Sequence, residues 1–247
     1  MTVISNLKLL TLVLSIGASL AQSGVSELDD TDLLQHISAS VNYLWSTTIE
    51  DEVWMCEEPC NGTWMLVDGS LKQVDASDTE VWGIDSADMI FKAPIDGSTN
   101  WTFVPGQMKH ISASGNGYVW AIGSGDVVHK CKKPCTGEWE AVDGVHLRQI
   151  DGGYSYVYGV TSSGNVFSKP VDGSGSWRQI PGSMKHITAS GRDEIIGISE
   201  EREIYRCIKP CVGEWEKMEG TARQCDASIN GIYCTDSELI LYPSVVN

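Results

Sequence analysis

A basic residue recurs about once every 38 residues along this 247-residue chain. The five positions are Lys72, Lys109, Arg148, Lys185 and Arg223, and Gln35 takes the same register one step earlier. Lysine and arginine donate charge-assisted hydrogen bonds to phosphate and carboxylate groups, and repetition of such a site gives avidity on a multivalent surface. These residues predict a basic crown that binds acidic glycans. The alternative is that they lie at strand ends and balance nearby acids.

The residue after each of these positions alternates between two types. Odd units carry His36, His110 and His186, and even units carry Gln73, Gln149 and Gln224. Three histidines at one-third intervals around a ring could chelate a metal on its axis. Glutamine is a poor transition-metal ligand, so the shared register favours a structural hydrogen bond within each unit. We therefore predict neither a metal nor a cofactor.

Aromatic residues form a second repeated set. The ladder consists of Trp64, Trp101, Trp139, Trp177 and Trp215, with steps of 37, 38, 38 and 38 residues. Recurring aromatics of this kind are typical of packing, so we interpret the ladder as scaffold. Tyr118 and Tyr154 fall in less regular hairpins, where we expect them to be exposed. A tyrosine joins an apolar ring to a polar group, which suits contact with a sugar.

The elements that position these residues are short strands. Six units each contain a four-residue β-branched and aromatic core such as Val81–Ile84, with a small residue third, and Gly, Asp, Asn and Ser separate the cores. Such strands, covered on both faces and crowded at one small position, predict an all-β, six-bladed β-propeller. Residues 22–247 supply six units of about 38 residues, and the sixth lacks its closing tryptophan strand. We expect the stretch from Leu28 to Ile37 to supply it, so that N- and C-terminal strands pair and close the ring.

The first 21 residues predict a secretory signal peptide. A short apolar run follows Lys8, and small residues precede the expected cleavage after Ala21. The formal net charge of the chain is −16, and cleavage changes it to about −17. Such an acidic surface argues against a nucleic-acid partner, because the phosphate backbone demands a cationic one. No other run approaches membrane-spanning length, so we predict a secreted, extracellular protein without membrane insertion.

Eight cysteines in a secreted chain predict four disulfides. Three pairs share one spacing, and the fourth lies in the last unit: Cys56 with Cys60, Cys131 with Cys135, Cys207 with Cys211, and Cys225 with Cys234. Zinc would need four ligands around one ion, and pairs about 75 residues apart in a repeat should lie far from one another. Asn61 and Asn100 stand in glycosylation sequons, which suits the secretory route.

Catalysis finds little support in the sequence. The chain contains no G-x-S-x-G, no phosphate-cradling glycine loop and no H-E-x-x-H. Its paired carboxylates, such as Asp29-Asp30, fall in turn-like stretches. We therefore expect a binding protein and not an enzyme.

Four segments carry a resemblance to a known family. They are PVDGSGSW (170–177), MKHITASG (184–191), RCIKPC (206–211) and RQCDA (223–227). These segments resemble the tectonin-repeat lectins, among which are the lipopolysaccharide-binding horseshoe-crab tachylectin and the fish egg lectins. The resemblance implies a six-bladed propeller that binds bacterial lipopolysaccharide or N-acetylglucosamine-type glycans through multivalent repeat sites.

The same resemblance implies a role in innate immune defence or egg protection, with other defence proteins as possible partners. The alternative is a structural or protein-interaction component of an extracellular or egg coat.

Overall fold

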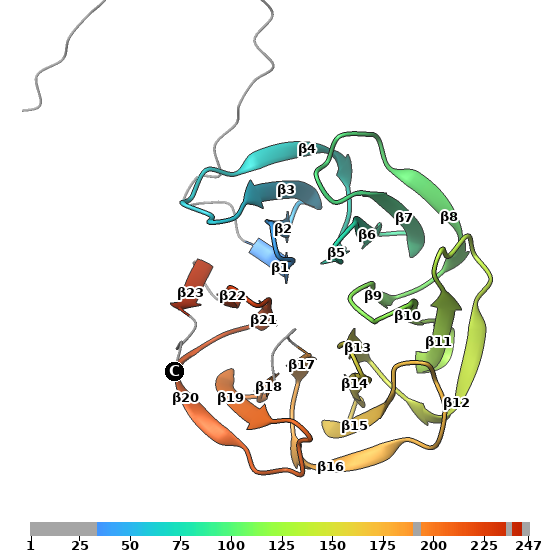
Figure 1. The fold of residues 1–247 in the computed structure, drawn as a ribbon, viewed down its shortest axis with the longest axis vertical. Helices are drawn as coiled ribbons and strands as arrows, with labels where there is room; N and C mark the ends of the chain where they lie inside the picture. Colours follow the sequence, from blue (N-terminus) through green and yellow to red (C-terminus); the bar gives the residue numbers. More distant parts are fainter. Residues whose placement is uncertain (1–33, 190–193, 236–238, 244–247) are drawn as a thin grey trace, which may run out of the picture.

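The computed structural model describes residues 34–189, 194–235 and 239–243, with side chains up to residue 235. Within these ranges 23 β-strands form five four-stranded antiparallel sheets and one three-stranded sheet. The sheets stand around a central axis as the blades of a propeller, each with its first strand innermost (Figure 1). The predicted all-β propeller is confirmed, and each of the six sequence units corresponds to one sheet.

The strand bounds follow the repeat. Blade 1 holds β1 (Leu34–Ala39), β2 (Tyr43–Thr48), β3 (Glu52–Glu57) and β4 (Met65–Ser70). Blade 2 holds β5 (Gln73–Ala76), β6 (Glu80–Ile84), β7 (Met89–Pro94) and β8 (Thr102–Gln107). Blade 3 holds β9 (His110–Ser112), β10 (Tyr118–Ile122), β11 (Val127–Lys132) and β12 (Glu140–His146), with the short 3-10 helix η1 (Ser124–Asp126) between β10 and β11.

The second half repeats this order. Blade 4 holds β13 (Gln149–Gly152), β14 (Tyr156–Val160), β15 (Asn165–Pro170) and β16 (Arg178–Ser183). Blade 5 holds β17 (His186–Thr188), β18 (Glu194–Ile198), β19 (Glu203–Ile208) and β20 (Glu216–Thr221). Blade 6 holds β21 (Gln224–Ala227), β22 (Gly231–Thr235) and β23 (Leu239–Pro243).

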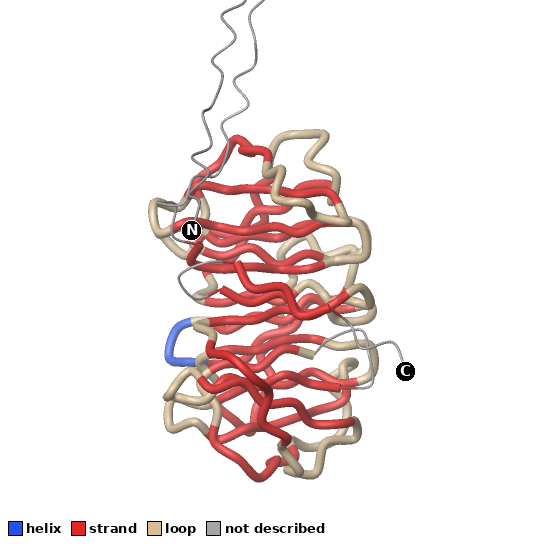
Figure 2. Tube along the Cα trace, turned by 90° about the vertical axis from the view of Figure 1, so that its left-hand side faces the viewer, coloured by secondary structure: helices blue, strands red, loops and turns tan. Residues whose placement is uncertain are grey.

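Burial decreases from the axis to the rim. All four residues of β5 and of β13 are buried, whereas most of β4 and β8 is exposed. The small third residue of each core lies at a crowded point, because a Cβ on Gly83 would stand 2.4 Å from Leu71 Cδ1. Seen edge-on, the strands run between the two faces of the disc and the loops lie on those faces (Figure 2).

The tryptophan ladder joins neighbouring blades at the rim. Trp139 Nε1 donates to the Pro105 carbonyl of the preceding blade at 2.9 Å, and its ring covers Gly106. Gly106 has φ 133°, and a Cβ there would stand 2.7 Å from Trp139 Nε1. Trp101 and Trp215 make the same kind of contact with Gly69 and Gly182. The ladder is scaffold, as interpreted from its spacing.

The ring is closed at its innermost strands. Gln224 of blade 6 hydrogen-bonds to both backbone groups of Ile37 in blade 1, and Tyr233 packs in one cluster with Ile37 and Leu44. Residues 34–37 of the expected closing segment lie in β1, the innermost strand of blade 1. Pairing of a closing N-terminal strand with β23 falls on residues 28–33, and the signal peptide on residues 1–21, all outside the described ranges.

Within the described ranges, no helix has the length and apolar character to cross a membrane.

Candidate functional site: the central channel and its two mouths

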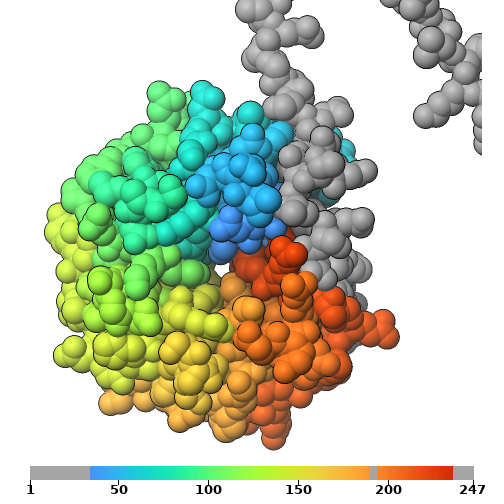
Figure 3. All heavy atoms as spheres, turned by 180° about the vertical axis from the view of Figure 1, so that it is seen from behind, coloured from blue at the N-terminus to red at the C-terminus, as the bar shows by residue number. Residues whose placement is uncertain are grey.

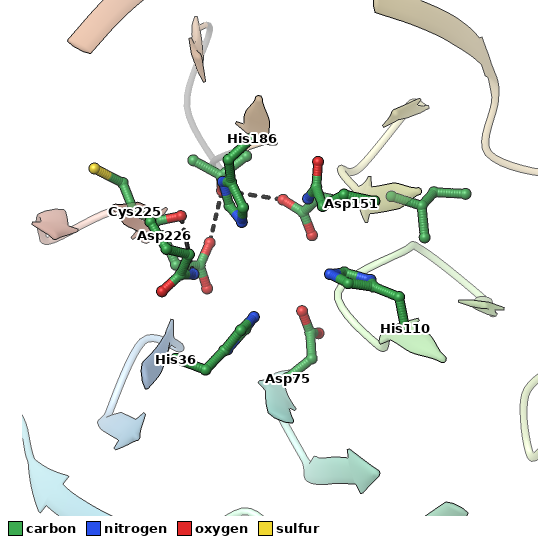
Figure 4. A pocket seen from close by; sticks show the side chains of 11 residues that line it. His36, Asp75, His110, Asp151, His186, Cys225 and Asp226 are labelled. Carbon is green, nitrogen blue, oxygen red and sulfur yellow. Dashed lines mark hydrogen bonds between the residues drawn. The ribbon is translucent and has the colours of Figure 1, made fainter. Parts of the chain in front are cut away.

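Each inner strand presents the same series of positions along the central channel. A crown cation comes first in five blades, and Gln35 takes its place in blade 1. His or Gln follows, and two residues further a Ser, Thr or Asp. Three histidines and three aspartates point into the channel, from alternate blades (Figure 4). They are His36, His110, His186, Asp75, Asp151 and Asp226. The crown residues and the turns that follow the inner strands therefore lie at opposite mouths.

The glutamines bind the blade ahead of their own. Gln73 Oε1 accepts from Ile111 N at 3.0 Å, and its Nε2 donates to Ile111 O at 2.7 Å. Gln149 repeats both bonds with Ile187, and Gln224 repeats them with Ile37. A side-chain amide thus pairs with a buried peptide unit as a neighbouring strand would, which leaves neither group unsatisfied. The structural role expected at this position is confirmed for the glutamines. Their hydrogen bonds join neighbouring blades and do not lie within one blade.

Each aspartate accepts a further hydrogen bond from the same neighbouring strand that its glutamine contacts. Asp151 Oδ2 accepts from Ala189 N at 2.6 Å, two residues beyond Ile187. Asp75 does the same with Ala113, and Asp226 with Ala39. Hydroxyl groups link the carboxylates into a belt, since Thr188 Oγ1 lies within hydrogen-bond distance of both Asp151 Oδ2, at 3.0 Å, and Asp226 Oδ1, at 2.6 Å. No role of these aspartates was predicted from the sequence.

Burial raises the pKa of all three belt carboxyls. The pKa of Asp226 rises to about 7, through burial first and the charge of Asp151 second. The pKa of Asp75 lies well above its usual range, through burial and then the charges of Asp151 and Asp226. Carboxyls this close in a narrow, poorly hydrated space disfavour one another's ionised forms. The belt therefore carries less negative charge than three free aspartates would.

The histidines are held in their neutral form. Burial lowers the pKa of His36 to about 4 and that of His186 to about 3, and the pKa of His110 also lies well below its usual range. The buried Nδ1 atoms of all three have no hydrogen-bond partner among the described residues. The expectation that each histidine hydrogen-bonds within its own blade is therefore wrong for Nδ1.

The waist of the channel is too narrow for a sugar. The space between the histidines and aspartates measures about 10 Å³, which is the room of about one water molecule. No group of three or more His, Cys, Asp or Glu in the described part of the chain is arranged to hold a metal ion. Figure 3 shows the central opening from behind. A ligand larger than water therefore does not fit inside the waist of the channel.

The basic crown lies on the face that carries η1. Three of its lysines pair with acids in nearby turns: Lys72 with Asp88, Lys109 with Asp126 at 3.5 Å, and Lys185 with Glu200 at 3.5 Å. Arg148 donates to the Lys185 carbonyl, and Arg223 is exposed. These partners match the alternative in which strand-end cations balance nearby acids. Binding of glycans by the crown stays a prediction.

The opposite mouth opens into a polar bowl of about 460 Å³. We define the bowl by the turns after the inner strands, at residues 40–41, 77–79, 114–117, 153–154 and 228–229, together with Lys133. Asp151 and Asp226 of the belt line it from within. The site was not predicted from the sequence, because the residues that follow the recurring Ala-Ser pair differ from unit to unit.

Three side chains of the bowl are available to a ligand. Tyr154 is 75% exposed. The Asn116 amide and the Thr79 hydroxyl are exposed and make no side-chain hydrogen bond with any described residue. Ser40 and Ser77 instead bond within their own turns. Lys133 donates to the Ala113 carbonyl, and burial lowers its pKa.

The two predicted tyrosines are placed differently. Tyr154 lines the bowl and is exposed, as expected. Tyr118 is partly buried, packs against the core shared by blades 3 and 4, and has Lys130 Nζ 5.4 Å from its ring centre. The expectation that Tyr118 is exposed is wrong, because the long stem of Lys130 covers it.

The covalent predictions fall into two groups. All four predicted cysteine pairs are disulfides, and no described cysteine is free. Four disulfides are consistent with an extracellular protein. Asn61 and Asn100 are both exposed, and their glycosylation stays a prediction.

Solved structures of low sequence identity share this fold. Human WBSCR16 is 11% identical at a TM-score of 0.59, over 86% of this chain and 73% of that one. The RRP9 WD40 repeats are 8% identical at 0.62, over 83% and 87%. YCF48 bound to D1 peptide is 13% identical at 0.58, over 91% and 96%. Identities this low show the propeller fold alone.

The family is shown by a different comparison. No curated protein matches the chain. The family model described as Tectonin domain matches residues 19–173, which is more than half of the chain. The narrower resemblance to tachylectin stays a prediction. The chain belongs to the tectonin family.

Proposed function

We propose that this chain is a secreted lectin that binds glycans, including those of bacterial lipopolysaccharide, at the polar bowl and without catalysis. The observation that carries the proposal is the bowl itself, about 460 Å³ in volume, with an exposed tyrosine and polar side chains that have no partner among the described residues. Sites for small ligands have volumes of this order. A sugar presents both apolar C–H faces and hydroxyls, which Tyr154, Asn116 and Thr79 of the bowl would contact.

The charge of the bowl suits an uncharged sugar. Asp78 is exposed there, and Lys133 is engaged with a backbone carbonyl. Among its described residues, the bowl therefore has no unopposed cation to select an anion. Family membership supports the lectin class, since the tectonin-repeat lectins that this sequence resembles bind sugars and lipopolysaccharide. A role in innate defence or egg protection belongs to the same proposal.

Two variants test the bowl on an array of glycans and purified lipopolysaccharides. Asn116→Trp places a large ring over the bowl, and Tyr154→Ala removes the exposed aromatic. We expect saturable, sugar-competed binding by the wild type, about tenfold weaker binding by Tyr154→Ala, and loss of binding by Asn116→Trp. Unchanged melting temperatures would show that both variants fold.

The matched control lies at the other mouth of the same channel. Lys109→Ala with Lys185→Ala removes two exposed crown cations and leaves the bowl intact. We expect this control to bind neutral glycans like the wild type. Loss of binding in the crown variant alone would move the site to the crown. Absence of any glycan signal, together with capture of a coat protein, would favour the structural alternative.

A further inference from the structure

Crown cations in three blades have an acidic partner within their own blade. The partner lies between the second and third strands, on the face that carries η1. The pairs are Lys72 with Asp88, Lys109 with Asp126 at 3.5 Å, and Lys185 with Glu200 at 3.5 Å. Each of these lysines is therefore neutralised from within the chain.

Blade 4 keeps the crown cation but has no acid in this turn. Arg148 N donates to the Val160 carbonyl at 2.8 Å, as Lys72 N does to the Ile84 carbonyl at 2.8 Å, so the cation stands alike in both blades. The turn of blade 4 at residues 161–164 reads Thr-Ser-Ser-Gly and contains no carboxylate.

Uncharged residues of that turn take both positions that carry an acid in the other blades. Ser162 stands two residues after the second strand, where blade 5 has Glu200. Gly164 stands four residues after it, where blades 2 and 3 have Asp88 and Asp126. The backbone keeps its shape, because φ is 85° at Gly164 and 65° at Asp88. Blade 4 thus has the same turn without its carboxylate.

The Arg148 guanidinium has donors to spare. Its Nη2 donates to the Lys185 carbonyl of blade 5 at 2.8 Å, and its buried Nε has no partner among the described residues. Arg148 is partly exposed and forms no ion pair with any described residue. A buried N–H group without a partner costs free energy, and a guanidinium binds an oxyanion through paired hydrogen bonds.

Blade 1 has the opposite imbalance. Gln35 replaces its crown cation, although its turn carries Glu50 and Asp51. Blade 1 lies across the ring from blade 4, so these acids do not reach Arg148 (Figure 1). Among the blades whose turn is described, blade 4 alone presents a crown cation without a carboxylate.

The turn of blade 4 supplies a further donor. The hydroxyls of Thr161 and Ser163 lie 3.0 Å apart and bond to each other. Ser162 is exposed, and its hydroxyl has no hydrogen bond with any described residue. An anion in the place of the missing carboxylate would contact both Arg148 and Ser162.

We propose that Arg148 and the turn at residues 161–164 form a site for one phosphate monoester group. The guanidinium forms charge-assisted hydrogen bonds with the phosphate, and the Ser162 hydroxyl donates to a further oxygen. A phosphate monoester carries about −1.5 to −2 charge at neutral pH, which suits a place where Arg148 and Lys185 are neighbours.

This phosphate site and the bowl lie at opposite mouths of the channel and share no residue. The site therefore goes beyond the proposed function and does not depend on it. One chain can hold a neutral glycan at one face and a phosphorylated group at the other.

Two substitutions of serine by glutamate test the site. Ser162→Glu gives blade 4 the acid that blade 5 has at the same position, so it should neutralise Arg148 from within. Ser86→Glu is the matched control, because it adds the same charge to the equivalent turn of blade 2, where Lys72 already has Asp88. Arg148→Lys keeps the charge and removes the paired donors.

The measurement is titration of the full chain with inorganic phosphate, glycerol 3-phosphate, acetate and glycerol, followed by the amide NMR signals of Ser162 and Lys185. We expect both phosphates to shift these signals with similar affinity, acetate to bind about tenfold more weakly, and glycerol to have no effect. Ser86→Glu should bind like the wild type. Ser162→Glu should bind phosphate about tenfold more weakly, and Arg148→Lys several-fold more weakly.

Four outcomes would overturn the assignment. A wild type that binds neither phosphate has no such site. Unchanged affinity in Ser162→Glu would place the phosphate elsewhere, and equal weakening in both glutamate variants would mean a response to net charge alone. Acetate binding as tight as phosphate would make the site one for carboxylates. Because the bowl is tested with neutral glycans, its result stands or falls separately.

Discussion

At the scale of single residues, the position that alternates between His and Gln on the inner strands has a different role in odd and even blades. Glutamine in the even blades satisfies a buried peptide unit of the next blade, while histidine in the odd blades is neutral and its Nδ1 has no partner among the residues that the structure describes. The alternation could be predicted from the sequence because it repeats. The partner of each side chain could not, because it lies about 38 residues away in another blade and no sequence pattern gives its orientation.

The histidines predict how the stability of the ring depends on pH. Unfolded histidine protonates near pH 6.5, whereas the folded ring lowers the pKa of His36 to about 4 and that of His186 to about 3. Between these values the unfolded state binds more protons, so stability rises with pH from about 4 to 6.5. Replacing His36, His110 and His186 by Gln, the residue of the even blades, should abolish this rise. At pH 5, replacing His36 and replacing His186 should each raise the free energy of unfolding by about 2 kcal/mol.

Denaturant unfolding of the wild type and of the triple glutamine variant at pH 5 and pH 7.5 checks this dependence of stability on pH. The raised pKa of Asp226, about 7, acts in the opposite direction, because the folded state then binds more protons and stability falls as pH rises from about 4 to 7. Both proteins retain the aspartates, so this contribution cancels in the comparison. An equal change with pH in the two proteins would show that the histidines are not buried as neutral rings.

At the scale of strands, the blades are held at two radii. Near the axis the Gln and Asp side chains form hydrogen bonds with the next inner strand. At the rim a tryptophan covers the glycine of the preceding outer strand. The strands and their order could be predicted, since short β-branched cores separated by turn residues allow few alternatives. The role of Gly106 required the structure, because its close neighbour Trp139 belongs to the next repeat.

Substitution of that glycine measures the rim contact. Gly106→Ala adds a Cβ 2.7 Å from Trp139 Nε1 at a residue with φ 133°, so we expect a loss of about 2–5 kcal/mol in the free energy of unfolding. Gly62→Ala is the matched control, because Gly62 also has positive φ, 93°, but nothing lies within 4 Å. It should lose about 1–2 kcal/mol. Equal losses in urea unfolding would mean that the tryptophan contact contributes nothing beyond backbone strain.

At the scale of the whole molecule, the first and last blades meet through side chains of the inner strands. Gln224 and Asp226 of blade 6 bond to Ile37 and Ala39 of blade 1, across a sequence separation of 187 residues. The sequence predicted that the ring closes. The Gln224 contact could not be foreseen, because the pattern suggested only a missing outer strand. A closing strand from residues 28–33 stays a prediction.

Matched glutamine variants separate closure from ordinary junctions. Gln149→Ala and Gln224→Ala each leave two buried backbone groups unsatisfied, so each should lower the free energy of unfolding by about 2–5 kcal/mol. Only Gln224→Ala should speed amide hydrogen exchange in both β1 and β21, since it opens the junction between the chain ends. The same exchange pattern in both variants would mean that this junction is no different from an internal one.

The candidate site itself could be predicted only in part. The crown repeats and was visible in the sequence, but its acidic partners in the turns were not. The bowl's exposed side chains Tyr154, Asn116 and Thr79 do not repeat, and its volume follows from the meeting of turns from five blades. A bowl on the axis also changes the expected stoichiometry, because one ring has one bowl, whereas repeated crown sites would bind several ligands.

The most direct test of the account is the stoichiometry of neutral-glycan binding, measured by titration with an N-acetylglucosamine trisaccharide. If the bowl is the glycan site, we expect one saturable site per chain. Binding should be weakened by Tyr154→Ala, lost in Asn116→Trp and retained when Lys109 and Lys185 are both alanine. Several equivalent sites per chain, or full binding by Asn116→Trp, would contradict it.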